Sequence, residues 1–380
     1  MKKIIIAPDS FKGSLTSIEV ANAIEEGIKK GIPNCEIVKL PIADGGEGTM
    51  DTLVSALEGE KIKIKAHDPL MRPIEVEYGL VKNGKTAIIE MAIASGLTLL
   101  DIVEQNPSTT TTFGTGEIIK DALKRGCQSF LIGIGGSATN DAGTGMLKAL
   151  GYRFIDKNGK ETDATGKSLS EISRIDESRV MPELKKAYFT IACDVNNPFS
   201  GPKGAAYVYA PQKGANEHLV KELDKGMESF RQLIEKVKGV NLNTIPGTGA
   251  AGGLGGGFVA FLNSELKPGI EMVLEAIDFE KHLQNADLVI TAEGKLDKQT
   301  AMGKAASGIL DAARQKNIPV IAIGGIVEDR EVLLKRGFSS LFSTTPSTMP
   351  LKEAMLKDIA KRNIIKTTKQ IIKSIEQLEN

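Results

Sequence analysis

Residues 3–20 read KIIIAPDSFKGSLTSIEV, and this stretch decides the fold class. The apolar run Ile4–Ala7 predicts a short buried strand, and the loop Pro8–Leu15 follows it. Thr16 and Glu19 have the spacing of a capping box, which predicts the start of a helix. A second strand is expected over Glu36–Leu40. Strand, helix and strand in this order are typical of a parallel α/β fold.

The C-terminal part of the chain shows the same alternation. Strands are expected at Asp287–Thr291, Pro319–Ile323 and Ser340–Ser343, with a helix at Gly303–Lys316 between the first two. One long amphipathic helix or a pair of helices is expected over Leu351–Leu378. The two ends of the chain therefore have the pattern of one parallel α/β domain.

The middle of the chain opens differently. Residues 73–91 alternate between apolar and polar side chains on both sides of Asn83 and Gly84, which predicts a β-hairpin because both turn positions favour a positive φ. The segment Asp68–Pro73 is expected to be a linker, and a second crossing is expected near Asn285.

These patterns together predict a two-domain α/β protein. A parallel, Rossmann-like α/β domain is expected from residues 1–67 and 287–380, with a mixed α/β domain of residues 68–286 inserted into it. The active site is expected in the cleft between the two domains, where small-molecule sites are common.

Composition excludes several classes of protein. The chain has 380 residues, 41% of them hydrophobic, and Lys plus Arg balance Asp plus Glu at 48 each. Without an excess of positive charge, neither nucleic acid nor a membrane surface is an expected partner. The start turns polar too early for a signal peptide, so a cytoplasmic location is expected. The cysteines, 3 in number, lack the spacing of a disulfide framework or a zinc site.

Four segments rich in turn-forming residues carry acidic side chains, and most of them follow apolar runs. They are Ala43–Thr49, Gly135–Asp141, Cys193–Pro198 and Ala292–Thr300. Ligands of α/β proteins bind where such loops meet at the carboxyl ends of strands. Glycines let backbone N–H groups approach an anion, and carboxylates hold a cation or accept a proton. The segments therefore indicate chemistry on a phosphate and a metal ion.

Other motifs are weaker. Gly247, Gly249 and Gly252 match GxGxxG, but the residues before them make a poor strand, which argues against a dinucleotide site. The segment Thr165–Ser168 resembles the end of a P-loop, yet Glu161 stands where its first glycine belongs. An NAD-dependent oxidoreductase acting on a small hydroxy acid and a noncatalytic small-acid binding protein remain as alternatives.

The chain resembles the glycerate kinases of the bacterial type (type I) over nearly its whole length. The resemblance is carried by the segments Ala7–Ser14, Pro41–Thr49, Ala94–Leu97, Thr111–Glu117, Ile134–Asp141, Ala192–Pro198, Gly249–Gly255 and Glu293–Thr300. Two departures are Ala142 and Ala292, where the family commonly has glycine. The resemblance implies ATP-dependent phosphorylation of D-glycerate to 2- or 3-phosphoglycerate with Mg²⁺, in a two-domain α/β protein. A homo-oligomer is possible.

Roles follow from the resemblance together with the chemistry of phosphoryl transfer. Asp194, Lys12 and Asp44 are the catalytic candidates, with Asp194 favoured as the base and Asp44 as a metal ligand. Either carboxylate can take either role. The metal candidates are Asp44, Glu293 and Asp297. The other candidates are the groups expected to contact ATP phosphates, Gly135, Gly136, Ser137, Gly252, Gly253 and Gly255, and those expected to contact substrate, Asp9, Ser10, Arg72 and Ser95.

Overall fold

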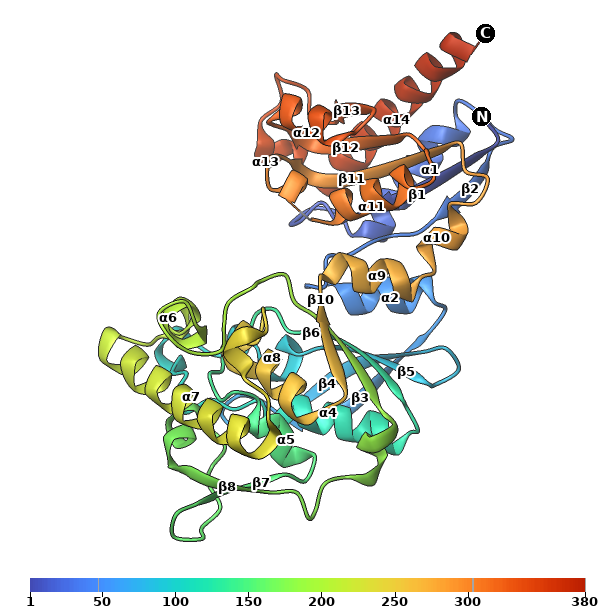
Figure 1. The fold of residues 1–380 in the computed structure, drawn as a ribbon. Coiled ribbons are helices and arrows are strands. Elements are labelled where there is room, and N and C mark those ends of the chain that lie inside the picture. Colours follow the sequence, from blue (N-terminus) through green and yellow to red (C-terminus); the bar gives the residue numbers. More distant parts are fainter. Residues whose placement is uncertain (47, 303, 380) are drawn as a thin grey trace. The chain divides into compact units, whose positions relative to one another are not determined.

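The computed structural model describes every residue except Glu47, Gly303 and Asn380, so Glu47 of the acidic loop and the first residue of the expected helix 303–316 lie outside the described residues. The chain divides into two compact units. The terminal unit contains Met1–Asp44 and Val273–Asn380, and the central unit contains Gly45–Met272. Figure 1 shows the ribbon of both units.

The terminal unit is built on a five-stranded parallel sheet with the order β13-β12-β11-β1-β2. The strands are β1 (Lys3–Pro8), β2 (Glu36–Lys39), β11 (Leu288–Leu296), β12 (Val320–Val327) and β13 (Ser340–Ser343). Its helices are α1 (Ser17–Lys29), α10 (Phe279–His282), α11 (Ala305–Arg314), α12 (Arg330–Arg336), α13 (Leu351–Ala354) and α14 (Lys357–Glu379). The parallel sheet expected from both chain ends is confirmed.

The capping box predicted at the start of α1 is present. The Thr16 side chain accepts from the Glu19 N–H, and the Glu19 side chain accepts from the Thr16 N–H. Ile4 and Ile6 of β1 pack in one core with Ile24 of α1 and Ile364 of α14. Ile5 is also fully buried, and because neighbouring strand residues point to opposite faces, both faces of β1 are covered.

The central unit holds a mixed six-stranded sheet with the order β10-β9-β6-β5-β4-β3. The strands are β3 (Glu60–His67), β4 (Pro73–Val81), β5 (Thr86–Glu90), β6 (Ser129–Gly133), β9 (Tyr188–Ala192) and β10 (Ser264–Lys267), and β7 (Arg153–Asp156) and β8 (Ile172–Asp176) form a separate pair. Its helices are α2 (Thr49–Ala56), α3 (Ala92–Ser95), α4 (Phe113–Lys124), α5 (Thr144–Ala149), α6 (Ala205–Tyr209), α7 (Glu217–Lys238) and α8 (Ala250–Phe261), while α9 (Gly269–Ala276) crosses the boundary to the terminal unit.

The predicted hairpin is confirmed. Strands β4 and β5 are antiparallel, and φ is positive at both Asn83 and Gly84. The strands β5, β6, β9 and β10 pair in parallel, so their carboxyl ends meet at one edge of the sheet.

The domain boundaries expected at 67/68 and 286/287 lie elsewhere, at 44/45 and 272/273. The reason is that β3 pairs antiparallel with β4 along its length and therefore belongs to the central sheet. The segment Asp68–Pro73, expected to be a linker, is the tight turn of this strand pair. The Asp68 carboxylate accepts the backbone N–H groups of Leu70 and Arg72 at 2.8 and 2.9 Å, and Met71 has a φ of 64°.

Two expected loops turn out to be regular structure. Strand β11 continues through Ala292 to Leu296 and pairs with β12, so Glu293 lies in a strand rather than in a turn. Gly255 lies inside α8, whose first turn is distorted by the positive φ of residues 251–253. No helix in the described part of the chain is long and apolar enough to span a membrane.

Candidate active site

Asp9 lies directly after β1 at the carboxyl edge of the terminal sheet. Its N–H donates to Ala292 O of β11 at 2.8 Å, and its carboxylate accepts the Ser10 N–H at 2.6 Å. The next residues form a tight turn in which the Phe11 N–H donates to Leu15 O, and Lys12 is exposed on this turn. The structure therefore brings Asp9, Ser10 and Lys12 into one loop beside β11.

The Asp9 carboxyl is electrostatically perturbed. Burial raises its pKa to about 7, the hydrogen bond from the Ser10 N–H opposes this rise, and the carboxylates of Asp44 and Glu293 add to it. Asp9, Asp44 and Glu293 therefore act on one another within the terminal unit. A carboxyl group of this kind changes its proton occupancy near neutral pH, which suits a group that meets a cation or a reacting proton.

Glu293 and Asp297 are joined through Thr300. The Thr300 hydroxyl donates to Glu293 Oε2 at 3.0 Å and accepts the Asp297 N–H at 3.2 Å, and Lys304 Nζ contacts Glu293 Oε1 at 3.3 Å. Burial raises the pKa of Glu293 against the opposing charge of Lys304. The pKa of Asp297 is lowered. Burial acts to raise it, but the hydrogen bonds from the Gln299 and Thr300 N–H groups outweigh the effect of burial.

The metal candidates can supply only part of the ligand set of a magnesium ion. In the part of the chain that the structure describes, no group of at least 3 His, Cys, Asp or Glu side chains is arranged to hold a metal ion. Magnesium is commonly bound by one or two carboxylates together with substrate phosphates and water. The oxygen donors of Asp44, Glu293 and Asp297 match this mode of binding.

In the central unit, Asp194 follows β9 and is exposed, and its carboxylate accepts the Gly269 N–H at 3.0 Å. Gly45, the first glycine of the acidic loop, lies beside the same strand end. Its φ is +88°, and a Cβ on it would be 2.7 Å from Ala192 Cβ. The loop that follows Asp44 thus begins next to the loop that carries Asp194, and only glycine fits at the point of contact.

Gly135, Gly136 and Ser137 form a turn after β6. Both glycines are exposed, Gly136 has a φ of +74°, and a Cβ on Gly135 meets no other described atom within 4 Å. Gly136 O accepts the Leu97 N–H at 2.9 Å, while Ser137 is buried. The turn has open space where a ligand phosphate is expected, with backbone N–H groups as possible donors.

Close packing, rather than open space for a ligand, explains the glycines at 252, 253 and 255. A Cβ on Gly252 would be 2.0 Å from Thr139 O, one on Gly253 would be 2.7 Å from Met227 Cε, and one on Gly255 would be 2.7 Å from Gly247 O. Close packing inside the central unit therefore requires all of them. The residues before this segment, Leu242–Thr244, form a 3-10 turn instead of a strand, which is not the context of a dinucleotide-binding motif.

Two of the substrate candidates are engaged by protein groups. Arg72 Nε contacts Asp68 Oδ2 at 2.5 Å and its Nη1 contacts Glu104 Oε1 at 2.8 Å. Ser95 is fully buried and shares a hydrogen bond of 2.7 Å with the Thr115 hydroxyl. The structure does not bring Arg72 and Ser95 into one open site.

Two buried ionisable groups of the central unit, Asp141 and Lys213, were not expected as a buried set from the sequence. Asp141 is fully buried, and its carboxylate accepts the Thr112 N–H and hydroxyl at 2.8 Å and the Gly145 N–H at 3.2 Å. Lys213 is also buried; burial lowers its pKa, and the charge of Asp141 opposes this shift. Asp141 stood in a motif already singled out, whereas the segment around Lys213 carries no local signal.

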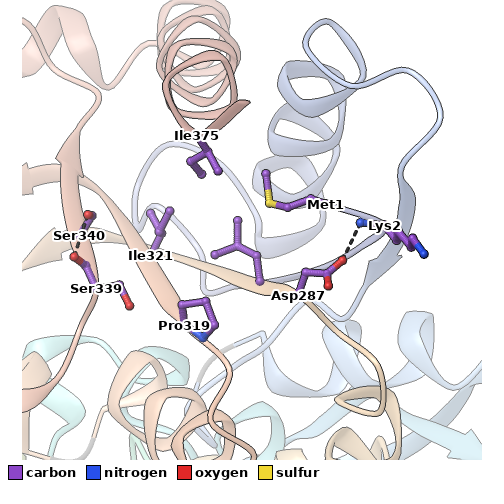
Figure 2. Close-up of a pocket in the computed structure, with 9 residues that line it drawn as sticks. Met1, Lys2, Asp287, Pro319, Ile321, Ser339, Ser340 and Ile375 are labelled. Atoms are coloured by element: carbon purple, nitrogen blue, oxygen red, sulfur yellow. Dashed lines mark hydrogen bonds between the residues drawn. The ribbon is translucent and has the colours of Figure 1, made fainter. Parts of the chain in front are cut away.

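The hollow drawn in Figure 2 lies at the other edge of the terminal sheet. Met1, Asp287 and Pro319 at its wall precede β1, β11 and β12, so it faces the amino ends of these strands. Asp287 there accepts the Lys2 N–H at 2.5 Å. None of the candidate residues lines it, and ligands of α/β folds bind at the carboxyl ends, so we do not assign the reaction to this hollow.

Parallel strands that end in acidic and Gly-rich segments define an α/β enzyme that acts on phosphate groups. The family model for the glycerate kinase family matches residues 4–376, and the chain belongs to this family. It is 46% identical to a glycerate kinase of Halalkalibacterium halodurans, with 96% of this chain and 97% of the relative covered. It is 43% identical to the glycerate 2-kinase of Escherichia coli K12, with 93% of each covered.

A solved structure agrees with these relatives. The fold matches the crystal structure of a protein assigned as glycerate kinase 2 from Salmonella typhimurium LT2 with a TM-score of 0.92. The two chains are 39% identical, and the match covers 100% of this chain and 99% of the other. The mixed α/β fold with two main sheets is thus shared along the whole chain.

Proposed function

We propose that this protein is a type I glycerate kinase, which transfers the γ-phosphoryl group of ATP to a hydroxyl of D-glycerate and gives phosphoglycerate and ADP. The match of the family model to residues 4–376 carries the proposal. The carboxylates and open Gly-rich turn described above supply the types of group that phosphoryl transfer requires.

In the proposed reaction, Asp194 accepts the proton of the attacking glycerate hydroxyl. Its exposure after β9 leaves the carboxylate accessible, and the Gly269 N–H holds one of its oxygens. A positioned base of this kind contributes roughly 10²–10⁴ in rate. Lys12, exposed on the turn after β1, supplies positive charge to a phosphate or to the substrate carboxylate.

Magnesium would neutralise charge on the ATP phosphates, and Asp44, Glu293 and Asp297 are the residues proposed to hold it. Asp9 and Ser10, beside Glu293 at the same sheet edge, are proposed to orient the substrate. In the central unit, Gly135, Gly136 and Ser137 are proposed to contact phosphate oxygens. We further propose that Gly252 and Gly253 act indirectly, because they hold the segment 139–142 that follows this turn.

Incubation of the protein with ATP, magnesium and D-glycerate, followed by phosphorus NMR, tests the function. We expect ADP formation that requires glycerate and is abolished by EDTA, and the NMR spectrum distinguishes 2- from 3-phosphoglycerate. Turnover with a sugar but not with glycerate would contradict the proposed substrate. Binding of NADH, or glycerate binding without ATP consumption, would support the two alternatives instead.

We also propose a cytoplasmic location, with small molecules rather than nucleic acid or membrane as partners. The balanced charge of 48 basic and 48 acidic residues supports this. Cell fractionation tests the location, and light scattering of the purified protein tests for a homo-oligomer.

A further inference from the structure

Lys213 is a buried lysine that the proposed reaction does not yet use. It ends the short 3-10 turn Pro211–Lys213, which connects α6 to α7 (Figure 1). Lys213 is only 2% exposed. Its Nζ donates to Ser137 Oγ at 2.5 Å and to Thr139 O at 2.6 Å. Ser137 directly follows the exposed Gly135 and Gly136, and Thr139 comes two residues after Ser137.

An ammonium group in this position is costly for folding. Lysine is almost never fully buried without a charged partner, and both groups that Lys213 touches are neutral oxygens. Among the described residues, Asp141 is the ionisable group whose charge acts on Lys213; burial raises the pKa of this carboxyl, and the Thr112, Gly143 and Gly145 N–H groups oppose that rise. An apolar side chain of similar size would avoid most of the desolvation penalty. The position of Lys213 therefore calls for a reason other than stability.

The contacts of Lys213 suggest that reason. Other groups also hold the turn, since the Leu97 N–H donates to Gly136 O and the Thr110 hydroxyl donates to Ala138 O. The polar atoms Thr139 Oγ1 and Asn140 Oδ1 are buried and have no hydrogen-bond partner within the described residues, so they do not fix the segment. Lys213 fixes the Ser137 hydroxyl and brings a positive charge behind the turn.

We propose that Lys213 is a positioning residue that holds the Gly135–Ser137 turn in its phosphate-binding form and places a positive charge behind the bound phosphate. This inference rests on the proposed function, because it deepens the role of the same turn. The occupant is the phosphate group of an adenine nucleotide, and the contact runs through Ser137 rather than from Lys213 itself.

The charge gives the proposal a pH signature. Burial lowers the pKa of Lys213 to about 7, and the Asp141 carboxylate opposes that shift. Below this pH the amine is charged and favours an anion at the turn, and above it the amine is neutral. A bound phosphate in turn favours the charged form. Nucleotide binding should therefore take up a proton near neutral pH and weaken as the pH rises through about 7.

The experiment measures binding of ADP with magnesium by calorimetry at pH 6 and pH 8.5, alongside melting temperature and the KM for ATP. The variants are Lys213→Met, which removes the charge and the donors, Lys213→Gln, which keeps donors without charge, and Ser137→Ala. The control is Lys221→Met, at an exposed lysine of α7. We expect Lys213→Met to weaken ADP binding about tenfold or more at pH 6 and to abolish the Lys213-linked pH dependence.

Lys213→Gln should recover part of the affinity for ADP but not its pH dependence. Ser137→Ala should weaken ADP binding but keep the pH dependence. Lys221→Met should match the wild type in both. Wild-type affinity and pH profile in Lys213→Met would overturn the proposal. So would a loss of folded protein with an unchanged KM in the folded remainder, since this marks a purely structural role.

If Lys213→Met does not fold, Lys213→Gln decides, and a wild-type pH profile in that variant overturns the proposal. The outcome is separable from the proposed function. Wild-type protein that binds ADP with the Lys213-dependent pH profile, but does not phosphorylate glycerate, would refute the substrate and retain the role of Lys213. Wild-type protein that binds no ADP would overturn both.

Discussion

The two units use parallel strands in the same way but present different chemistry at the carboxyl ends. In the terminal unit, Asp9 follows β1 and Glu293 lies in the C-terminal half of the adjacent β11, and the charges of Glu293 and Asp44 act on Asp9. In the central unit, the turn after β6 offers exposed Gly135 and Gly136, with buried Lys213 behind it. One sheet edge is acidic and the other is rich in N–H groups, with positive charge behind them.

This difference matches the two demands of phosphoryl transfer. Carboxylates suit a metal ion and a hydroxyl that loses a proton, whereas N–H groups and an ammonium suit phosphate oxygens. Asp194 is the exception, because it is a carboxylate on the central sheet. It is therefore the residue whose substitution tests the comparison most severely.

Asp194→Asn should have the largest effect. Loss of a proton acceptor predicts a fall in kcat of at least about 10²-fold with an unchanged magnesium requirement. Asp44→Asn should instead be partly rescued by excess magnesium, as expected for a metal ligand. Steady-state kinetics over a magnesium series measures both, and Asp163→Asn, at an exposed aspartate of the central unit, is the control. A reversed pattern would exchange the two roles, and near-normal activity in both variants would move the chemistry to Glu293 and Asp297.

The glycines of the central unit give the next largest effect. Gly253 has a φ of +88° and a Cβ there would be 2.7 Å from Met227 Cε and 2.9 Å from Phe199 Cε2. Gly253→Val should therefore destabilise the protein by about 3 kcal/mol or more. Gly135→Val, at a position with open space, should melt close to the wild type and raise the KM for ATP several-fold. Thermal melts and ATP kinetics of the pair measure this contrast.

The opposite results would separate packing from binding in another way. If Gly253→Val folds normally and only its KM for ATP rises, then the segment at 252–255 contacts nucleotide directly. If Gly135→Val has normal kinetics, the open turn after β6 does not approach a phosphate.

Local patterns of the sequence were sufficient for much of the fold. The capping box at Thr16 and the turn at Asn83 and Gly84 are set by neighbouring residues, and both predictions are confirmed. The domain boundary was wrong because the assignment of β3 depends on its pairing with β4 and not on its own residues. Glu293 was placed in a turn because its neighbouring glycine suggests one, whereas pairing with β12 continues the strand.

The candidate site was harder to predict for the same reason. The Gly-rich segments could be found, but whether a glycine faces open space, as Gly135 does, or packs against a carbonyl, as Gly252 does, depends on distant residues. Lys213 is 76 residues from Ser137 in the chain, so their contact leaves no local pattern. Ala142 stands where the family commonly has glycine, and its φ of +54° shows a backbone that favours glycine.

Asp9 provides a smaller effect that tests the acidic edge of the terminal unit. Its pKa in the folded protein is about 7, above the ordinary value of 3.8, so between these values the folded state holds a proton that the unfolded state has released. Stability should therefore fall as the pH rises through this window. Asp9→Asn removes this titration. Its free energy of unfolding, relative to that of the wild type, should therefore rise by about 1–3 kcal/mol from pH 5 to pH 8.

Urea unfolding at both pH values, in EDTA to exclude magnesium, measures this gain. Asp311→Asn, at an aspartate on α11 of the same unit, is a matched control that should run parallel to the wild type. A difference between wild type and Asp9→Asn that does not depend on pH would show that burial, together with the charges of Asp44 and Glu293, does not raise the pKa of Asp9 in the folded protein.

Arg72 should give the smallest effect. Its position made it a candidate for binding the substrate carboxylate, but its guanidinium contacts Asp68 at 2.5 Å and Glu104 at 2.8 Å and is about half exposed. Arg72 is half exposed but its partner Asp68 is buried, and that carboxylate keeps the Leu70 and Arg72 N–H groups as donors in the variant. Arg72→Gln should therefore lower stability by only about 1 kcal/mol and change the KM for glycerate less than about threefold. Glu104→Gln, which removes one of the two partners, should behave in the same way. If Arg72→Gln instead raises the KM for glycerate tenfold while Glu104→Gln does not, Arg72 leaves its ion pairs to bind substrate. The central unit would then contribute a cation to substrate binding, and the division between an acidic and a phosphate-binding sheet edge would need to include it.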